Sequence, residues 1–293
     1  MTSTDSPWDR FRADYAESRL AMIGLILLMA VVLVGLLAPA ISPQNPYDLA
    51  QLDVMDSKLA PGEKSAAGAT YWLGTDDQGR DMLSGIFYGL RISLGVGIAS
   101  TVFALAIGLV FGLVAAYFGG WVDTLVMRIV DIQLSFPAIL IALILLAVLG
   151  QGVDKIVIAL VTVQWAYYAR TVRSSALVER QKEYIEAAQV LAIGQARVVF
   201  RHLLPNCLPP LIVVATVQVA HAIALEATLS FLGLGLPITE PSLGLLISNG
   251  FQYLLSGKYW ISFYPGLALL VTIMAINLVA DQLRDVLNPR LRK

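Results

Sequence analysis

The chain has 293 residues, of which 57% are hydrophobic and 14% are charged. Soluble domains carry about 25% charged residues, so one water-soluble core cannot absorb this much apolar surface. The formal net charge of -1 gives no support for nucleic-acid binding, and we expect no nucleic-acid partner. The composition therefore predicts an all-α membrane protein in contact with membrane lipids.

Six apolar stretches predict six transmembrane helices. Crossing about 30 Å of hydrocarbon takes about 20 apolar residues in a helix, and most of the stretches reach that length. The fourth is shorter because Lys155 and Arg170 enclose it, so we expect its helix to continue past Arg170 into water. The stretches cover residues 20–38, 92–118, 125–149, 156–169, 208–231 and 259–280.

The first stretch ends at Ala38-Pro39-Ala40, which resembles the small-residue cleavage site of a secretory signal peptide. The apolar region of a signal peptide has about 7–15 residues. This stretch is longer, and Pro39 lies inside the would-be site. We therefore expect the first helix to be a retained membrane anchor.

The positions of the basic residues predict the orientation, because Lys and Arg in short loops stay on the cytoplasmic side. With the N- and C-termini cytoplasmic, most of the 20 basic residues fall on that side. They are Arg10, Arg12, Arg19, Arg128, Arg170, Arg173, Arg180, Lys182, Arg197, Arg201, Arg284, Arg290, Arg292 and Lys293.

The longest segment expected outside, residues 39–91, is rich in the residues typical of loops. Its Gly74-Thr-Asp-Asp-Gln-Gly79 has the glycine spacing of a phosphate-binding loop, but Arg80 and Asp81 replace the residues that bind phosphate and magnesium. Two interpretations stay open: local pairing around a tight turn, or a docking surface for a soluble partner. The residues concerned are Asp76, Asp77, Arg80 and Asp81.

A polar, helix-forming insert separates the fourth and fifth apolar stretches. A helix over about residues 181–192 places four residues on one face, where small alanines allow a partner to approach closely. They are Tyr184, Ala187, Ala188 and Leu191. Glu183 and Glu186 lie early in this helix, where carboxylates complement the positive end of its dipole.

A second short helix is expected after the first. Gly194 can supply the left-handed residue that ends the first helix. Arg197 and Arg201 then align at i, i+4, and Pro205 stops the second helix. Two short helices at an angle form a protruding elbow for a partner protein. The alternative is an amphipathic pair lying on the lipid headgroups, with its arginines on the phosphates.

Ionisable residues inside a membrane are costly and tend to be functional. Asp131, His221 and Glu226 lie within the predicted spans and are candidates for lining a polar translocation path. Hydrogen bonding between helices is the alternative interpretation. The motif Gly108-Leu-Val-Phe-Gly112 predicts close helix packing, either within the chain or toward a partner subunit.

The chain offers little for catalysis. It has two histidines and one cysteine, and it lacks the motifs of metal sites and activated nucleophiles. A membrane-embedded protease using Asp131 and Asp281 would lack its flanking motifs. We expect no catalytic residue, no metal and no cofactor on this chain. Composition alone also allows a stand-alone channel or a secondary carrier.

A set of motifs runs through the chain from about residue 10 to residue 293. They include Trp72-Leu-Gly-Thr-Asp-Asp-Gln-Gly-Arg-Asp-Met-Leu-Ser84, Tyr88-Gly-Leu-Arg-Ile-Ser-Leu94, Ala116-Tyr-Phe-Gly-Gly120, Met127-Arg-Ile-Val-Asp131, Glu186-Ala-Ala188, Glu226-Ala-Thr-Leu-Ser-Phe-Leu-Gly-Leu-Gly235 and Leu283-Arg-Asp-Val-Leu-Asn-Pro-Arg-Leu291. These motifs resemble the C-type permease subunit of dipeptide and oligopeptide ABC importers.

The resemblance implies a type I ABC importer permease fold with six transmembrane helices in the bacterial cytoplasmic (inner) membrane. It implies that the elbow is a cytoplasmic coupling-helix loop that docks onto an ATPase. The residues concerned are Tyr184, Glu186, Ala187, Ala188, Leu191, Gly194, Arg197 and Arg201.

The same resemblance implies the partners and the solute. The partners are a B-type permease subunit, two ABC ATPase subunits that hold ATP and Mg, and a periplasmic or lipid-anchored solute-binding protein. The implied solute is a dipeptide or oligopeptide, and glutathione, nickel or an opine are the alternatives.

Two positions depart from the family pattern. Ala192 stands where a glycine is expected, with Gly194 two positions later, and His202 stands at an expected hydrophobic position. We therefore expect the first elbow helix to run slightly longer than usual. We expect three parts: residues 1–90 with the first span and outer loop, a permease domain over 91–282, and a cytoplasmic tail over 283–293.

Overall fold

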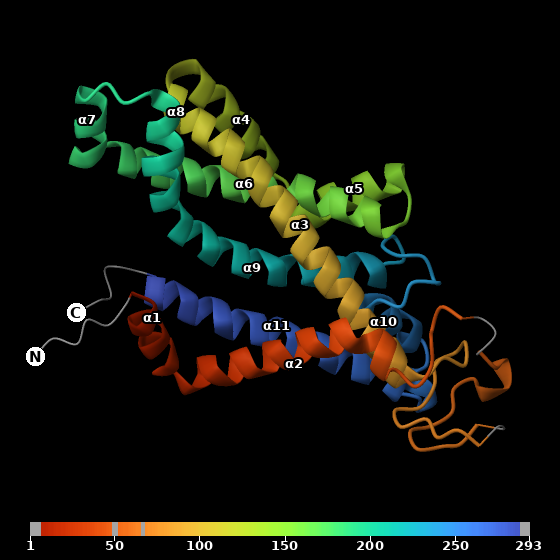
Figure 1. The fold of residues 1–293 in the computed structure, drawn as a ribbon. Coiled ribbons are helices and arrows are strands. Elements are labelled where there is room, and N and C mark those ends of the chain that lie inside the picture. The colour runs from red at the N-terminus through yellow and green to blue at the C-terminus, as the bar shows by residue number, and fades with distance from the viewer. Residues whose placement is uncertain (1–6, 49–51, 66–67, 288–293) are drawn as a thin grey trace, which may run out of the picture.

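The protein is almost entirely helical (Figure 1). A computed structural model describes residues 7–48, 52–65 and 68–287. Within these ranges no β-strand forms, and β-pairing consists of the isolated bridges Lys64–Thr70 and Thr75–Asp81. The predicted all-α class is confirmed. Arg290, Arg292 and Lys293 of the predicted cytoplasmic tail lie outside the described residues.

Long helices form the body, and shorter helices connect them or cover their ends. The long helices are α2 (Arg19–Ile41), α3 (Met82–Phe118), α6 (Val153–Arg180), α9 (Leu204–Phe231) and α11 (Trp260–Leu287). The shorter helices are α1 (Pro7–Ala16), α4 (Gly120–Ser135), α5 (Ala138–Leu149), α7 (Glu183–Val190), α8 (Gln195–Arg197) and α10 (Leu243–Phe251). Single turns are η2 (Val54–Asp56), the π-helical η3 (Val198–Leu203) and η4 (Leu254–Ser256).

The third predicted span is not one straight helix. α4 and α5 meet at a bend of 90°, where Phe136 takes an extended backbone (φ -95°, ψ 144°) before Pro137. Proline pushes the preceding residue out of the helical region. The prediction of an uninterrupted helix over residues 125–149 is therefore wrong.

The predicted count of six spans is not confirmed by length and composition. Among the described residues, four helices meet those criteria, or five if α4 and α5 form one bent span. α6 is not among them, although it continues past Arg170 as predicted. Neighbouring helices enclose it, and Ile156, Leu160 and Tyr168 are fully buried. Because α6 exposes less of its surface to lipid, it needs fewer apolar residues than a helix that faces lipid.

Glycines let α3 and α6 pack closely. A Cβ on Gly108 would lie 2.6 Å from the carbonyl oxygen of Trp165, and a Cβ on Gly112 would lie 2.7 Å from the Cβ of Val172. Both distances are well below a carbon contact distance of about 3.5–4.0 Å. The predicted packing motif is confirmed, and its partner helix belongs to the same chain.

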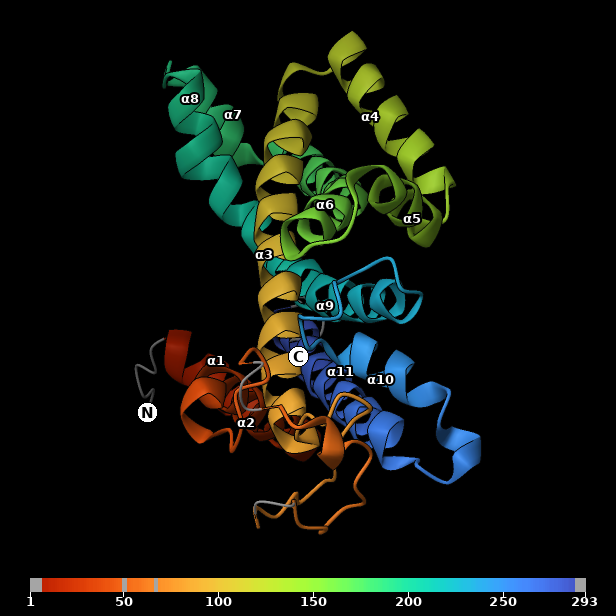
Figure 2. The same cartoon turned by 90° about the vertical axis from the view of Figure 1, so that its right-hand side faces the viewer.

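The helices run between two ends of the molecule. α1, α7 and α8 lie at the left of Figure 1, and α10 lies toward the right with a lobe of irregular chain. We call this lobe, over residues 42–48, 52–65 and 68–81, the loop lobe. Figure 2 shows α3 running from the loop lobe at the bottom toward α7 and α8 at the top.

Candidate functional site

The elbow, formed by α7, α8, η3 and the residues between them, projects where α6 ends and α9 begins. Tyr184 connects the elbow to both helices by hydrogen bonds. The Tyr184 hydroxyl donates to Glu179 Oε2 of α6 at 2.7 Å and accepts from Asn206 Nδ2 of α9 at 3.1 Å. Burial and the Glu179 carboxylate raise the pKa of Tyr184 to about 12. The hydroxyl therefore stays protonated, as a donor, at neutral pH.

One face of α7 packs inward. Ile185 and Ala188 are buried in a small cluster with Val198. Ala188 therefore does not face a partner, and the prediction that it shares an outward face is wrong. The larger Ile185 sets the inward face, and Ala188 lies on that face three residues later.

The outward surface of the elbow is apolar in part and flanked by charges. Val190 and Leu191 are 85% and 74% exposed, and Phe200 is 66% exposed. Further exposed residues are Glu186, Ala187, Gly194, Arg197 and Arg201. A patch of exposed large apolar side chains rimmed by charged ones is typical of an interaction surface.

α7 ends earlier than the sequence predicts. It stops at Val190, and Ala192 takes the left-handed conformation with φ 51°. Gly194, the predicted left-handed residue, has φ -54° and precedes α8. The amide of Ile193 donates to the carbonyl oxygen of Ala188 at 3.1 Å. This bond closes the helix end and places residue 192 in the left-handed position.

The second helix of the elbow does not stop at Pro205. The chain passes from α8 through η3 directly into α9, and Pro205 lies in the first turn of α9. The amide of Leu204 donates to the carbonyl oxygen of Val199, as in a π-helical turn. Proline is tolerated here because a first-turn amide needs no partner within its helix.

Two charged residues of the loop lobe pair with each other. Asp76 forms an ion pair with Arg80. Oδ1 of Asp76 also accepts the backbone amides of Gln78 at 2.8 Å and of Arg80 at 2.9 Å. This carboxylate takes up amides that a phosphate-binding loop would offer to phosphate.

Asp81 is the N-cap of α3. Its carboxylate accepts from the amide of Ser84 at 2.9 Å and from the Ser84 hydroxyl at 2.6 Å. Its own amide donates to Gln44 Oε1 at 2.7 Å. This cap lets α3 begin at Met82, ahead of the apolar stretch that starts at residue 92.

The predicted docking surface needs correction. Asp76, Arg80 and Asp81 are buried, and they bond within the lobe, to Ser84 of α3 and to Ile238. Asp77 is half-buried, and burial together with the neighbouring Asp76 raises its pKa. Buried side chains cannot form an exposed docking surface, so the local-pairing interpretation fits them.

Glu226 is enclosed by helices. Its carboxylate is fully buried in α9 and accepts from the hydroxyls of Ser93 of α3 at 2.9 Å and of Ser230 at 2.8 Å. This is the helix-to-helix bonding that the sequence left as an alternative. A lining role in an open path, as predicted, does not fit this placement.

Asp131 joins α4 to α6. Its carboxylate pairs with Arg170, and both side chains are about half exposed. A second pair supports the same junction, because Arg173 donates to both carboxylate oxygens of Asp123 at 2.6 Å. Asp131 therefore bears a compensated charge.

His221, the third candidate for a translocation path, faces a hollow between α5, α6 and α9. We call this space the polar hollow, and its volume is about 280 Å³. Its polar lining residues are Gln164, Tyr167, Gln218, His221 and Thr228. Neither Asp131 nor Glu226 lines it.

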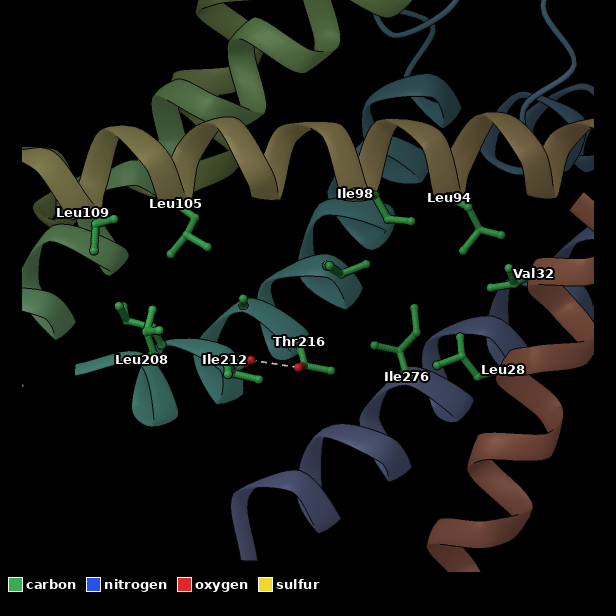
Figure 3. Close-up of a pocket in the computed structure, with 13 residues that line it drawn as sticks. Leu28, Val32, Leu94, Ile98, Leu105, Leu109, Leu208, Ile212, Thr216 and Ile276 are labelled. Carbon is green, nitrogen blue, oxygen red and sulfur yellow. Dashed lines mark hydrogen bonds between the residues drawn. The ribbon is translucent and has the colours of Figure 1, made fainter. Parts of the chain in front are cut away.

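A larger groove lies between α2, α3, α9 and α11 (Figure 3). Its volume is about 400 Å³, and leucines such as Leu94, Leu105 and Leu109 of α3 line it. The hydroxyl of Thr216 in its wall already donates to the carbonyl oxygen of Ile212 at 2.8 Å. This groove matches hydrocarbon rather than a polar solute.

Sequence reasoning missed Gln164, Tyr167 and Gln218 because it searched the spans for ionisable groups. A signal was present, since Gln164 and Tyr167, like Gln218 and His221, are three residues apart and share a helix face. It also missed Val190, which lies beside the predicted contact residues.

The long apolar helices define a multi-pass membrane protein. A family model described as "Binding-protein-dependent transport system inner membrane component" matches residues 108–293. A second, "N-terminal TM domain of oligopeptide transport permease C", matches residues 6–61. The chain belongs to the family of inner membrane components of binding-protein-dependent transport systems, and it is an ABC transporter permease.

Similar proteins carry peptide-transport names. The dipeptide transport system permease protein DppC of Alkalihalophilus pseudofirmus is 36% identical over 98% of this chain and 91% of that protein. A putative peptide transport system permease protein of Brucella suis is 40% identical over 92% and 88%. The oligopeptide transport system permease protein OppC of Bacillus subtilis is 35% identical over 98% and 91%.

Solved structures show the same fold. The inward-facing MetNI methionine ABC transporter matches with a TM-score of 0.57 at 23% identity, over 71% of this chain and 98% of that chain. An amino acid ABC transporter with histidines matches with a TM-score of 0.53 at 14% identity, over 68% and 92%. The fold is that of ABC importer membrane subunits.

Proposed function

We propose that this chain is the C-type permease subunit of an ABC importer for dipeptides or oligopeptides. It forms half of the translocation path, and a related B-type permease subunit forms the other half. Two cytoplasmic ATPase subunits bind ATP and Mg and hydrolyse the ATP, and a solute-binding protein delivers the peptide from outside. The peptide-transport names of its relatives support the solute class.

The elbow is the observation that carries this proposal. Its exposed apolar residues Val190 and Leu191 need a protein partner if the elbow stands in water. Tyr184 connects the elbow to both α6 and α9, so a push on the elbow moves both helices. ATPase closure would thereby shift the spans as rigid bodies between inward and outward access.

In the proposed orientation, the elbow, α1 and the end of α11 lie in the cytoplasm, and the loop lobe lies outside. Arg173, Arg180, Arg197 and Arg201 all lie toward the elbow end. Positive charge gathers on the cytoplasmic side of bacterial membranes, which supports this orientation.

The test replaces an apolar residue of the elbow surface with a charged one. In Leu191→Glu, we expect ATPase subunits to co-purify at least about tenfold less, as expected for an interface residue worth about 1.4 kcal/mol or more. Membrane insertion should be normal, and peptide uptake into vesicles should fall. Trp72→Glu is the matched control, because Trp72 is also exposed (70%) but lies in the loop lobe.

Normal ATPase recruitment and uptake in Leu191→Glu would reject the elbow as the docking element. Uptake of labelled peptides by the parent complex, compared with glutathione, nickel and an opine, tests the solute class. Uptake that continues with the ATPase inactivated would point to a carrier or channel instead.

A further inference from the structure

Three polar groups without a partner in the described part of the chain converge on the polar hollow. The side-chain carbonyl oxygen of Gln164 is buried and makes no hydrogen bond, although the residue is only 3% exposed. The hydroxyl of Tyr167 has no partner among the described residues, and this side chain is 43% exposed. His221 uses Nδ1 toward Gln218 Oε1 at 3.1 Å, which leaves Nε2 unpaired.

Several hydroxyls on the same helices form hydrogen bonds within their own helix. The hydroxyls of Thr162 and Thr171 on α6 donate to the carbonyl oxygens four residues earlier, at 2.8 and 2.9 Å. On α9, Thr228 does the same toward Ala224. The buried hydroxyl of Tyr168 on α6 also lacks a partner, but Tyr168 does not line the polar hollow, whereas Gln164, Tyr167 and His221 do.

Hydrocarbon cannot satisfy these groups, because a lipid tail offers neither a donor nor an acceptor. The face must meet water, a solute or another protein. Gln164 is also held in place, since its side-chain amide donates to the carbonyl oxygen of Gln218 at 3.0 Å. Its free oxygen is thereby a positioned acceptor.

The chemistry of the lining indicates the kind of solute group it takes. The Gln164 oxygen accepts, the Tyr167 hydroxyl both donates and accepts, and the His221 ring nitrogen does one or the other according to its tautomer. The lining contains no Asp, Glu, Lys or Arg. The charges of Asp131 and Arg170, on α4 and α6, compensate each other.

We propose that the polar hollow is this chain's contact site for the backbone amides of a passing peptide. Every peptide presents such N–H and C=O groups whatever its side chains, so an uncharged lining of donors and acceptors suits a carrier of varied sequences. Gln164, Tyr167 and His221 make the contacts. The inference rests on the proposed peptide importer and assigns its solute-contact residues.

The first experiment asks whether solute and water reach the polar hollow. A single cysteine is introduced as Ala224→Cys in a Cys207→Ala background, in the complete transporter in vesicles. We expect a charged methanethiosulfonate reagent to modify it, and transported peptide to slow the modification severalfold. Ala215→Cys is the control, because it lies on the same helix but lines the apolar groove, and it should stay unmodified.

The second experiment removes hydrogen-bonding groups at nearly constant volume with Tyr167→Phe and Gln164→Met. The readout is uptake of trialanine relative to its backbone N-methylated analogue, delivered by the same binding protein. We expect both variants to keep ATPase recruitment, to take up trialanine severalfold more slowly, and to lose part of the parent's preference for the unmethylated peptide.

The outcomes separate the two proposals. Peptide uptake by the parent, with unchanged uptake and preference in both variants, overturns this inference and leaves the proposed function intact. Loss of the B-type subunit on purification of either variant also overturns it, since the face would then be a subunit interface. A parent complex that takes up no peptide but imports another solute overturns the proposed function itself.

Discussion

Asp76 and Arg80 form an ion pair that is closed off from water: 2.7 Å separates Asp76 Oδ2 from Arg80 Nε, and the side chains are 0% and 3% exposed. The same guanidinium donates to the carbonyl oxygen of Ile238, between α9 and α10, at 3.2 Å. Removal of one partner of such a pair leaves an uncompensated buried charge. The folding of the loop lobe and its attachment to the helices therefore depend on both residues.

Arg80→Leu should strongly destabilise the loop lobe. Breaking a buried pair costs about 3–5 kcal/mol, which should appear as a lower Tm in detergent and faster proteolysis of residues 52–81. Adding Asp76→Asn to Arg80→Leu should recover part of the loss. Lys155→Leu is the control, because the Lys155–Asp154 pair is exposed and such pairs contribute about 0–1 kcal/mol. A parent-like Tm for Arg80→Leu would contradict the structural role.

Asp77→Asn should stabilise the lobe in a pH-dependent way. Burial and Asp76 raise the pKa of Asp77 above its ordinary value of 3.8, so the folded lobe favours the protonated form. The stability that this group contributes is present at pH below 3.8 and is lost as pH rises through the raised pKa. The Tm of the variant minus that of the parent should thus be near zero in acid and grow toward neutral pH. A Tm difference that stays constant across this pH range would contradict the raised pKa of Asp77.

Ala192→Gly should stabilise the elbow. The left-handed conformation costs a non-glycine residue about 1–2 kcal/mol, and Ala192 adopts it with φ 51°. Hydrogen exchange of residues 183–198 should slow in the variant. Ala187→Gly, in the middle of α7, should speed exchange instead, since glycine within a helix costs about 1 kcal/mol. If both substitutions changed the rate of hydrogen exchange in the same direction, the assignment of Ala192 to the left-handed position would be refuted.

Gly112→Leu should separate α3 from α6. Overpacking costs about 1–3 kcal/mol or more, because even a Cβ at this position would lie 2.6 Å from the carbonyl oxygen of Ala169. We expect a lower Tm and poor assembly. Gly95→Ala on the same helix is the control, since its Cβ would meet nothing within 4 Å. Equal stability of Gly112→Leu and Gly95→Ala would contradict the close packing of α3 against α6.

Hydropathy predicts α2, α9 and α11 well because their apolar residues must face lipid whatever their neighbours are. It fails where a single residue changes the backbone. Pro137 bends the third span through its effect on Phe136, and Asp81 extends α3 toward the loop lobe by capping it. Both signals are local and visible in the sequence, whereas their effect on the length of a span is not.

The elbow was predictable as a polar insert, but its faces were not. Which side of α7 points inward depends on the packing of Ile185 against Val198, which belongs to a later segment. The polar hollow was only partly predictable for the same reason. His221 attracts attention as an ionisable residue, whereas the free oxygen of Gln164 becomes recognisable only when its partners are known.

The single unbroken helix α3 limits how the two faces of the membrane can influence each other. Its 37 residues span about 55 Å at a rise of 1.5 Å per residue. Asp81 caps the end of α3 at the loop lobe. At the other end, the guanidinium of Arg180 donates to the carbonyl oxygens of Ala116 and Tyr117 at 2.9 and 3.1 Å. A continuous helix cannot shorten. A signal that α3 carries from one face of the membrane must therefore reach the other face as a tilt or a rotation of the helix.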